Sequence, residues 1–367
     1  MDLRVNARVG EKRYPVVIGS GNLKELERYL SGFNEKSIVI ICDSYFNKPI
    51  GMSHVLKMTS RYPTMYIDGG IESKEFNIFM KIIEWLVDIK LAKDGVIIAI
   101  GGGVIGDIGA FVASTYLRGV KLVHVPTTTT AMIDSSIGGK TGINHLSQVN
   151  IIGSYYSPNA NFMNISFLDT LSERDFCSGI SEAIKMAITS DERQASELMK
   201  YNYTTLSTNS LLITKLVHWS ILTKLKHVCD DEKEKDMRLV LNYGHTFGQA
   251  IESFYGLRQN HLRHGEAVAL GMTIAAKLSK LLYHTKQADD LYTYTIEILK
   301  KYNLPSHLND LTLPYMPTID ILSENLVNDK KRTSSGNRFI LCQSIGEASI
   351  VKVEEEDSIK EAISSIF

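Results

Sequence analysis

The sequence predicts an α/β N-terminal domain with a Rossmann-like parallel sheet, followed by an all-α C-terminal domain. In the first half, short β-branched apolar runs alternate with segments whose apolar residues recur at helical spacing, which is typical of parallel strands joined by helices. From about Thr170 onward, apolar residues recur every three or four positions and few strand candidates remain. We therefore expect residues 1–165 to form the α/β domain and residues 166–367 to form the helical domain.

The composition excludes several classes of protein. With 44% hydrophobic and 22% charged residues, the chain of 367 residues is typical of a globular protein. Its 40 basic and 41 acidic residues nearly balance, which predicts no nucleic-acid partner and no attraction to an anionic membrane. The four scattered cysteines predict neither a zinc ribbon nor a disulfide scaffold, and no apolar run is long enough for a transmembrane helix. We therefore expect a cytoplasmic protein.

The first elements predict a sheet edge and then a buried strand. Polar and apolar residues alternate from Arg4 to Gly19 around a turn at Gly10 to Lys12, which predicts a β-hairpin at the edge of a sheet. The run from Ser37 to Ile41 (SIVII) predicts a buried strand, and Asp43 follows it where α/β sheets present ligand-binding groups. Asp43 is therefore either the acid that binds a nucleotide or a turn or helix N-cap residue.

The stretch from Gly95 to Asn144 is the centre of the predicted first domain and follows a helix predicted over Phe76 to Leu86. Its apolar start, Val96 to Ile100, predicts a strand buried on both faces. The glycines that follow, Gly101 to Gly103, let a ligand approach the backbone at a helix N-terminus, which predicts a phosphate site. The acid of a dinucleotide fingerprint is missing about 20 residues later, so a glycine-rich turn without a ligand is the alternative.

A polar patch follows the second apolar run, which ends at Pro126. Lys140 lies in SSIGGKTG, where glycines and small hydroxyls create an open loop that suits a phosphate or carboxylate; a solvated loop lysine is the alternative. Asp134, six residues earlier, suits a hydrogen bond from a hydroxyl or a nicotinamide amide. Arg118 ends the helix after the glycines, a position where cations are common because of the helix dipole alone.

The helical half contains candidates for a metal site. Glu182 and Lys185 are three residues apart and so share one face of a helix. A predicted helix through LVLNYGHTFGQAIESF carries a polar stripe, and a buried stripe of this kind needs partners. Its members are spaced by four, three and four residues: Arg238, Asn242, His245 and Gln249.

His264 opens a further predicted buried helix in RHGEAVALGM. One glutamate with two histidines from separate helices is a common catalytic zinc set, here Glu182, His245 and His264. His261 competes with His264 for the third position, and a histidine satisfied within the core is the alternative for either.

Six motifs resemble those of one family, in the same order and over nearly the whole chain. They are GGGVIGDIGAFVASTYLRG, VPTTTTAMIDSSIGGKTGIN, NIIGSYYSP, SGISEAIK, LNYGHTFG and RHGEAVALGM. Together they resemble the 3-dehydroquinate synthases of the shikimate pathway, which belong to the sugar phosphate cyclases. Glycerol and iron-dependent alcohol dehydrogenases share the fold and a GGG loop, but they lack the GKTG lysine and this pairing of GHT with HGE.

The resemblance implies two cofactors, a sugar phosphate substrate and a homodimer. It implies a zinc ion, or cobalt in its place, on Glu182, His245 and His264. It implies NAD on Asp43, Lys74, Gly102, Gly103, Asp107, Thr127, Thr128, Asp134, Lys140, Phe167, Thr170 and Leu171. It implies a substrate surrounded by Arg118, Asp134, Lys140, Asn150, Lys185, Lys224, Arg238, Asn242 and Gln249, with Lys330 or Lys331 at the phosphate.

Three positions depart from the family pattern. Gln249 replaces the second histidine of GHTxGHA, and Val149 replaces the lysine of GKN. Ile71 stands where the GExxK motif has its acid, with Glu72 displaced by one residue. Because glutamine can position a hydroxyl or water but cannot shuttle a proton at neutral pH, we expect Gln249 to orient a group and not to titrate.

The implied reaction converts 3-deoxy-D-arabino-heptulosonate 7-phosphate to 3-dehydroquinate and phosphate. It runs through NAD-dependent oxidation, phosphate elimination, reduction, ring opening and aldol closure. By the same resemblance Arg238 and Asn242 face the substrate carboxylate and its neighbouring hydroxyl, and the planar fork of an arginine suits a carboxylate. The alternatives are a cyclase for an amino-substituted heptulosonate, for sedoheptulose 7-phosphate or of the 2-deoxy-scyllo-inosose type, a metal- and NAD-dependent polyol dehydrogenase, and a binding protein that only keeps the fold.

Overall fold

The computed structural model describes residues 2–47, 53–146, 148–256, 261–327 and 338–367, which form two compact units. The first unit comprises Met1–Leu171 and Ser210–Lys233, and the second comprises Ser172–Asn209 and Glu234–Phe367. The chain therefore leaves the first unit and returns to it once. The single boundary predicted at residue 165 does not describe this returning segment. Its helical periodicity led us to expect it in the second domain.

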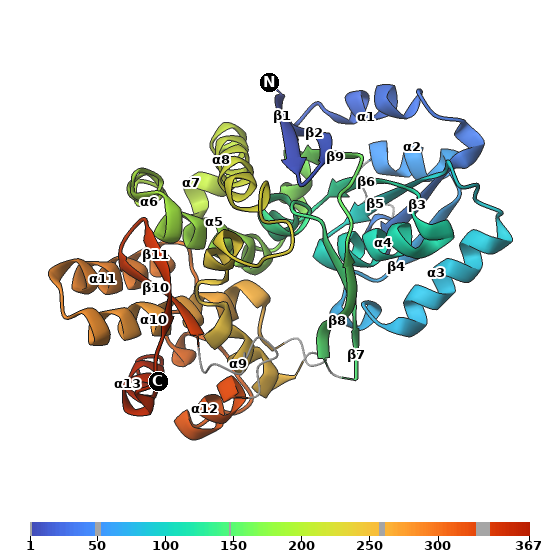
Figure 1. The fold of residues 1–367 in the computed structure, drawn as a ribbon. Coiled ribbons are helices and arrows are strands. Elements are labelled where there is room, and N and C mark those ends of the chain that lie inside the picture. Colours follow the sequence, from blue (N-terminus) through green and yellow to red (C-terminus); the bar gives the residue numbers. More distant parts are fainter. Residues whose placement is uncertain (1, 48–52, 147, 257–260, 328–337) are drawn as a thin grey trace. The chain divides into compact units, whose positions relative to one another are not determined.

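A seven-stranded sheet forms the core of the first unit, in the order β1-β2-β9-β6-β5-β3-β4 (Figure 1). Its strands are β1 (Leu3–Val9), β2 (Lys12–Gly19), β3 (Ile38–Asp43), β4 (Thr64–Ile67), β5 (Val96–Gly101), β6 (Lys121–Pro126) and β9 (Ala160–Asn164). Only β1 runs antiparallel to its neighbour, β2. The predicted parallel sheet and the predicted hairpin at its edge are both confirmed.

Helices bury the sheet on both faces, which explains why its strands are continuously apolar. On one face, Val39, Ile41 and Ile97 pack into a cluster with side chains of α3 (Phe76–Asp88) and α4 (Gly103–Thr115). The alternate residues of the same strands, such as Ile40 and Ile98, are also fully buried. The helices of this unit are α1 (Leu23–Leu30), α2 (Ser53–Arg61), α3 (Phe76–Asp88), α4 (Gly103–Thr115) and the returning α8 (Ser210–Val228).

A hairpin of β7 (Lys140–His145) and β8 (Gln148–Tyr155) packs on α4, although the sequence predicts no strand there. Ile143 enters the apolar cluster beneath it, and Ser154 Oγ donates to Ser114 Oγ at 2.8 Å. The hairpin contains many small and polar residues, so its sequence lacks the alternation of polar and apolar residues that predicts a strand. The short central strand β9 was also missed, because its five residues lie directly before the expected domain boundary at residue 165.

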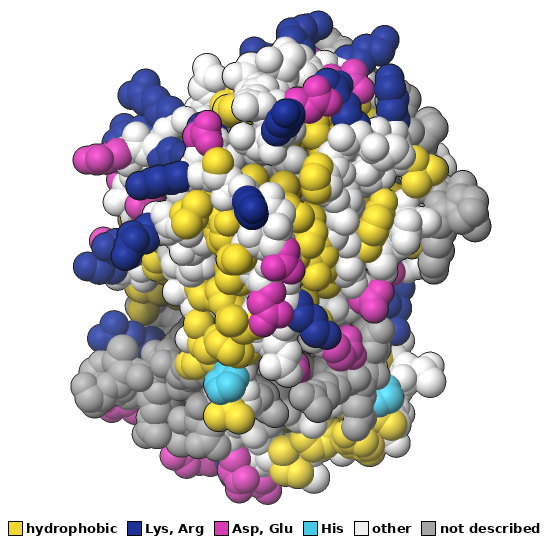
Figure 2. Space-filling view, turned by 90° about the vertical axis from the view of Figure 1, so that its right-hand side faces the viewer, with side chains coloured by type: hydrophobic (Ala, Val, Ile, Leu, Met, Phe, Trp, Pro, Cys, Tyr) yellow, Lys and Arg dark blue, Asp and Glu magenta, His cyan; other side chains and the backbone are white. Residues whose placement is uncertain are grey.

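The first unit also exposes hydrophobic side chains. Val149, Ile151 and Tyr155 alternate along β8 and are 42%, 50% and 40% exposed. Phe76 and Val87 are exposed on α3. Figure 2 views the molecule from the side of α3 and shows hydrophobic side chains gathered in a band. A contiguous band of this kind marks a candidate interaction surface.

The second unit is helical, as predicted, and contains one additional β-hairpin. The hairpin consists of β10 (Arg338–Ser344) and β11 (Glu347–Lys352). The helices are α5 (Glu173–Ser190), α6 (Glu192–Leu198), α7 (Tyr203–Ser207), α9 (His245–Tyr255), α10 (His264–Tyr283), α11 (Lys286–Lys301), α12 (Ile319–Val327) and α13 (Glu356–Ser364). No helix in the described part of the chain is long and apolar enough to cross a membrane.

The single helix predicted through LVLNYGHTFGQAIESF is wrong. The 3₁₀ helix η7 (Met237–Asn242) ends before Gly244, and α9 begins at His245. Gly244 adopts φ of 75°, and a Cβ there would lie 2.9 Å from the backbone nitrogen of Met272 in α10. This close approach needs glycine and a left-handed backbone, which break the helix. Arg238 and Asn242 therefore do not continue the helical stripe of His245.

Candidate functional site

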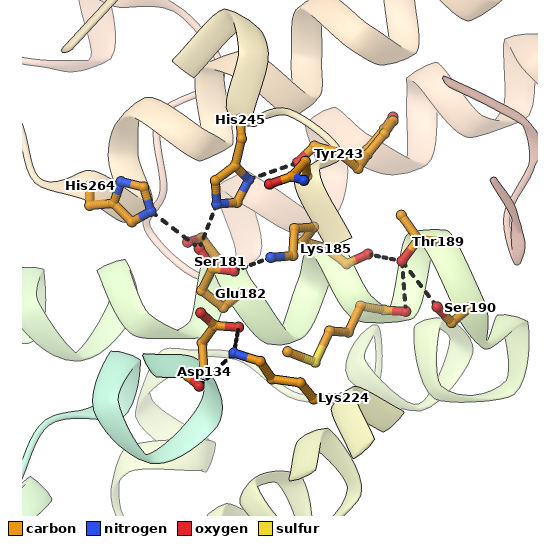
Figure 3. Close-up of polar contacts among 12 residues, drawn as sticks. Asp134, Ser181, Glu182, Lys185, Thr189, Ser190, Lys224, Tyr243, His245 and His264 are labelled. Carbon is orange, nitrogen blue, oxygen red and sulfur yellow. Dashed lines mark hydrogen bonds and ion pairs between the residues drawn. The ribbon is translucent and has the colours of Figure 1, made fainter. Parts of the chain in front are cut away.

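Three helices of the second unit bring Glu182, His245 and His264 together (Figure 3). Glu182 lies in the middle of α5, whereas the two histidines are the first residues of α9 and α10. The three side chains offer ligand atoms within 4.8 Å of one another. The Nε2 atoms of both histidines lie 3.6 Å from Oε1 of Glu182. His261 is outside this cluster, and its carbonyl accepts a hydrogen bond from Arg174.

The other ring nitrogens of the two histidines each face an oxygen. His264 Nδ1 lies 2.9 Å from Oε1 of Glu252, and His245 Nδ1 lies 3.2 Å from the carbonyl oxygen of Tyr243. When Nδ1–H donates to those oxygens, a neutral imidazole keeps its Nε2 lone pair on the side of Glu182, as in a metal site. Sequence reasoning missed Glu252, although its position two helical turns after His245 places both on one face of α9.

Glu182 tests whether these residues fit a metal ion. Its Oε1 is buried and has no hydrogen-bond partner among the described residues, while its Oε2 pairs with Lys185. An orphaned buried carboxylate oxygen flanked by two imidazole nitrogens suits zinc or cobalt. Desolvation in the site lowers the pKa of His264, but the carboxylates of Glu252 and Glu182 outweigh it and raise this pKa to about 9. The cluster therefore attracts positive charge, and a divalent metal fits it.

Three further predicted residues lie on the elements next to these ligands in the chain. Arg238 is buried in η7, and Asn242 ends that helix and donates from Nδ2 to Oε1 of Glu234 at 2.6 Å. Gln249 is half-buried on α9, one turn after His245. Glu234 was missed because its charged surroundings, DDEKEKD, resemble a solvated surface segment.

In the first unit, the glycines after β5 form a cradle at the start of α4. Gly102 is the N-cap of α4 and offers no side-chain cap to the N–H groups of its first turn. A Cβ at Gly102 would lie 3.0 Å from Cγ2 of Thr128, and one at Gly103 would lie 3.3 Å from Oγ of Ser135. Side chains would therefore fill the cradle. Backbone N–H groups at a helix N-terminus in such a space suit the pyrophosphate of NAD.

Asp43 ends β3, which lies next to β5 in the sheet, so its carboxylate is at the same strand ends as the glycines. Its Oδ1 accepts a hydrogen bond from Tyr45 N at 3.0 Å, and burial raises its pKa. Phe167 packs edge-on against Phe46, with ring centroids 5.5 Å apart. The remaining predicted residues of this group follow strands or end the unit: Thr127 and Thr128 after β6, and Thr170 and Leu171 after Phe167.

Two ion pairs bring predicted residues of the first unit together. Lys74 is buried and pairs with Asp107 on α4. Burial raises the pKa of Asp107, although the Lys74 ammonium acts in the opposite direction. Lys224 on α8 donates to Oδ1 of Asp134 at 2.7 Å and to its carbonyl oxygen at 2.6 Å (Figure 3). The return of α8 to this unit therefore joins two residues that are 90 positions apart.

The other predicted residues lie on exposed parts of the first unit or outside the described residues. Lys140 begins β7 and is exposed, and Asn150 has φ of 51° within β8. Arg118 was expected to end the helix after the glycines, but α4 stops at Thr115 and Arg118 follows with φ of 63°. Lys330 and Lys331 lie outside the described residues.

The chain is similar to known proteins along most of its length. Residues 64–178 match the N-terminal family model of 3-dehydroquinate synthase, and residues 179–332 match the C-terminal one. The chain is 38% identical to a 3-dehydroquinate synthase of Geotalea uraniireducens over 79% of this chain and 78% of that one. It is 34% identical to a 3-dehydroquinate synthase of Vibrio atlanticus over 98% of both chains.

Solved structures share the fold. A 2-deoxy-scyllo-inosose synthase complexed with carbaglucose-6-phosphate, NAD+ and Co2+ covers 100% of both chains with a TM-score of 0.83 at 24% identity. The 2-epi-5-epi-valiolone synthase of Streptomyces hygroscopicus subsp. jinggangensis 5008, with NAD+ and Zn2+ bound, covers 99% of both with a TM-score of 0.84 at 23% identity. From the matches of both family models and the identity along the whole chain, this protein belongs to the 3-dehydroquinate synthase family.

Proposed function

We propose that this protein is a 3-dehydroquinate synthase, a lyase that converts 3-deoxy-D-arabino-heptulosonate 7-phosphate into 3-dehydroquinate and phosphate. One observation carries the proposal. In this member of the family, His245 and His264 flank the buried Oε1 of Glu182, which has no hydrogen-bond partner among the described residues. The reaction belongs to the shikimate pathway of aromatic amino acid biosynthesis. A reducing cytoplasm is the proposed compartment, since all four cysteines are free thiols.

The two implied cofactors fit the two groups of residues. When bound, NAD supplies a reversible hydride acceptor, and Zn2+ or Co2+ makes a coordinated hydroxyl more acidic. Glu182, His245 and His264 hold the metal in this proposal, and the cradle of Gly102 and Gly103 receives the pyrophosphate. The residues that would hold the rest of the cofactor are Asp43, Lys74, Asp107, Thr127, Thr128, Asp134, Lys140, Phe167, Thr170 and Leu171.

The charged residues position the substrate. Arg238 binds the substrate carboxylate, and Asn242, oriented by Glu234, binds the neighbouring hydroxyl. Cationic and polar residues hold the phosphate and the sugar hydroxyls: Arg118, Lys140, Asn150, Lys185, Lys224 and one of Lys330 and Lys331. Because the oxygens of the leaving phosphate can accept the proton that is lost in the elimination, these residues act by positioning and electrostatics.

We also propose a homodimer through the exposed hydrophobic side chains of β8. In the described residues β8 pairs on one edge only, with β7, and its outward side chains Val149, Ile151 and Tyr155 are exposed. An antiparallel pairing of two β8 edges is symmetric, so a second copy of the chain suits this surface. Size-exclusion chromatography with light scattering tests it: Ile151→Lys should give a monomer, and a monomeric wild type contradicts the proposal.

The activity is tested by phosphate release from 3-deoxy-D-arabino-heptulosonate 7-phosphate. We expect stoichiometric phosphate and 3-dehydroquinate without net accumulation of NADH, because the hydride returns to the product in each turnover. A chelator should abolish the release, and Zn2+ or Co2+ should restore it. A panel with sedoheptulose 7-phosphate and glycerol separates the alternatives: turnover of the former alone indicates another cyclase, and net NADH from glycerol indicates a polyol dehydrogenase.

A further inference from the structure

We infer that Glu252 is a positioning residue of the metal site, which fixes the ring of His264 and supplies negative charge behind it. The inference rests on the proposed metal site of Glu182, His245 and His264. It goes further by assigning a function to Glu252, which neither the sequence motifs nor the resemblance identified.

The position of Glu252 couples two of the ligand helices. His245 begins α9, and Glu252 lies two turns later on the same helix. From there its Oε1 reaches Nδ1 of His264, the first residue of α10, at 2.9 Å. One helix therefore supplies a ligand of its own and also orients the ligand of its neighbour.

The two histidines differ in what lies behind them. His245 faces the carbonyl oxygen of Tyr243 at 3.2 Å, which is a neutral acceptor, whereas His264 faces a carboxylate. A carboxylate behind a metal-binding imidazole fixes its tautomer and makes its other nitrogen a stronger donor to the metal. The donor strength of His264 therefore depends on a side chain, that of Glu252.

His264 needs this support more than His245 does. Its side chain is 43% exposed, compared with 12% for His245, so packing restrains the ring less. Its backbone is held firmly: Gly265 N donates to Ser178 Oγ at 3.0 Å, and Arg174 donates to both oxygens of Glu266 at 2.6 and 2.7 Å. These contacts anchor the start of α10 on α5, and the hydrogen bond with Glu252 helps to orient the imidazole.

Charge also favours a role for Glu252. The positive dipole end of α10, a helix of 20 residues, begins at His264 and disfavours a cation there. Lys185 pairs with Glu182 and offsets the charge of that ligand. Glu252 adds a negative charge directly behind His264, which compensates for both effects when a divalent ion binds.

The test is Co2+ binding to the metal-free protein, followed by calorimetry and by the visible absorption of the bound ion. Glu252→Gln keeps a hydrogen-bond acceptor for Nδ1–H but removes the charge, and we expect about 10- to 100-fold weaker binding. Glu252→Leu removes both, so we expect a larger loss and an altered absorption spectrum. Glu297→Gln on α11, an exposed isosteric change in the same unit, should bind Co2+ like the wild type.

Equal Co2+ affinity of Glu252→Gln, Glu252→Leu and the wild type, with phosphate release intact, overturns the role of Glu252 and leaves the proposed function standing. Absence of Co2+ binding by the wild type overturns the metal site as well. The melting temperature of the metal-free variants separates a positioning role from a structural one. We expect it to equal that of the metal-free wild type, and a loss of affinity that only follows a loss of folding contradicts the inference.

Discussion

Arg238 is the residue that most narrows the choice of substrate. Its side chain is 2% exposed, and the planar fork of donors on its guanidinium suits a carboxylate. With the heptulosonate phosphate, we expect kcat/KM to fall about 10-fold in Arg238→Lys, which keeps the charge but loses the planar fork, and about 100-fold or more in Arg238→Ala. Steady-state kinetics with both variants measure this.

The control for Arg238 is a substrate without a carboxylate. Any residual turnover of sedoheptulose 7-phosphate should change little in either variant, because the bond to the carboxylate is absent from the start. Equal losses with both substrates would sink the assignment of Arg238 to the carboxylate. Circular dichroism of the variants checks that the buried site still folds.

Gln249 tests how much general-base work the protein performs. Gln249→His restores the residue typical of the family, and we expect turnover to stay within about 10-fold of the wild type, which corresponds to about 1.4 kcal/mol in the barrier. The reason is that the leaving phosphate accepts the proton in the proposed elimination. A rise by several orders of magnitude, or a wild type without turnover, contradicts this expectation; the pH profile of kcat should also be unchanged.

At the scale of single residues, the sequence supplied the candidates but not their partners. The motifs identified Glu182, His245 and His264, and the structure gathers these three rather than His261. Glu252 and Glu234 have no comparable signal, because a carboxylate on a helix face or in a charged segment is common on any protein surface. Their roles depend on distances between segments, which a pattern of residues does not contain.

At the scale of the elements, the start of α10 packs so closely on α5 that it leaves no space for a larger residue. A Cβ at Gly265 would lie 1.8 Å from the backbone oxygen of Ser178 in α5. Because neither backbone can move without shifting a metal-ligand helix, we expect Gly265→Ala to lower the free energy of unfolding by about 1–3 kcal/mol or more and to weaken Co2+ binding. Chemical denaturation and Co2+ titration of the variant provide the two measurements.

Gly32→Ala is a suitable control for Gly265→Ala. Its new Cβ would meet the Tyr29 carbonyl oxygen at 3.4 Å, an ordinary contact, and its φ is not in the left-handed region. We expect a change in unfolding free energy within about 0.5 kcal/mol. If both alanine variants behave alike, the close approach of α10 to α5 does not limit the second unit.

The helices and strands could be predicted where the sequence shows one clear pattern, either a continuous apolar run or apolar residues at helical spacing. Strands β3 and β5 are continuous β-branched runs, and α3, α10 and α11 show apolar residues at helical spacing. Prediction failed where tertiary contacts decide the backbone. Gly244 breaks a helix that spacing alone continues, and β7 and β8 form a hairpin from small and polar residues because α4 lies beneath them.

The acid stability of the whole molecule should depend on His124 in β6. Burial lowers the pKa of His124 to about 4, so its imidazole is neutral in the folded protein. Between about pH 6.5 and about pH 4 the unfolded chain binds the extra proton, so stability present above pH 6.5 is lost as the pH falls through this window. The size of the effect is about 3 kcal/mol, from about 1.4 kcal/mol for each pKa unit.

Urea denaturation of the wild type and His124→Leu at about pH 7 and about pH 4 measures this contribution. We expect the variant to be less stable at neutral pH but to lose about 3 kcal/mol less on acidification. The carboxylates titrate alike in both proteins and cancel in the comparison. Parallel pH dependence in the two proteins contradicts the assignment to His124.

At the scale of the whole molecule, the sequence shows a change from alternating strands and helices to helices alone, but not the path of the chain. The helix α8 has the same periodicity as the helices around it, yet it belongs to the first unit. Only packing reveals this, through the contacts of α8 with β1, β2 and the segment of Asp134. The resemblance implied that Lys224 and Asp134 both lie at the substrate, but the ion pair between them was not predicted.

The return of α8 has a consequence for how the protein is made. Synthesis from the N-terminus delivers the sheet by residue 171, but the first unit lacks residues 210–233 until the chain has passed through the start of the second. A fragment that stops at residue 171 would expose the surface that α8 covers and would lack Lys224. Neither unit is one continuous stretch of sequence, so dividing the gene at a single point yields two fragments that each lack part of a unit. During synthesis, the first unit is complete only after residues 210–233 have left the ribosome.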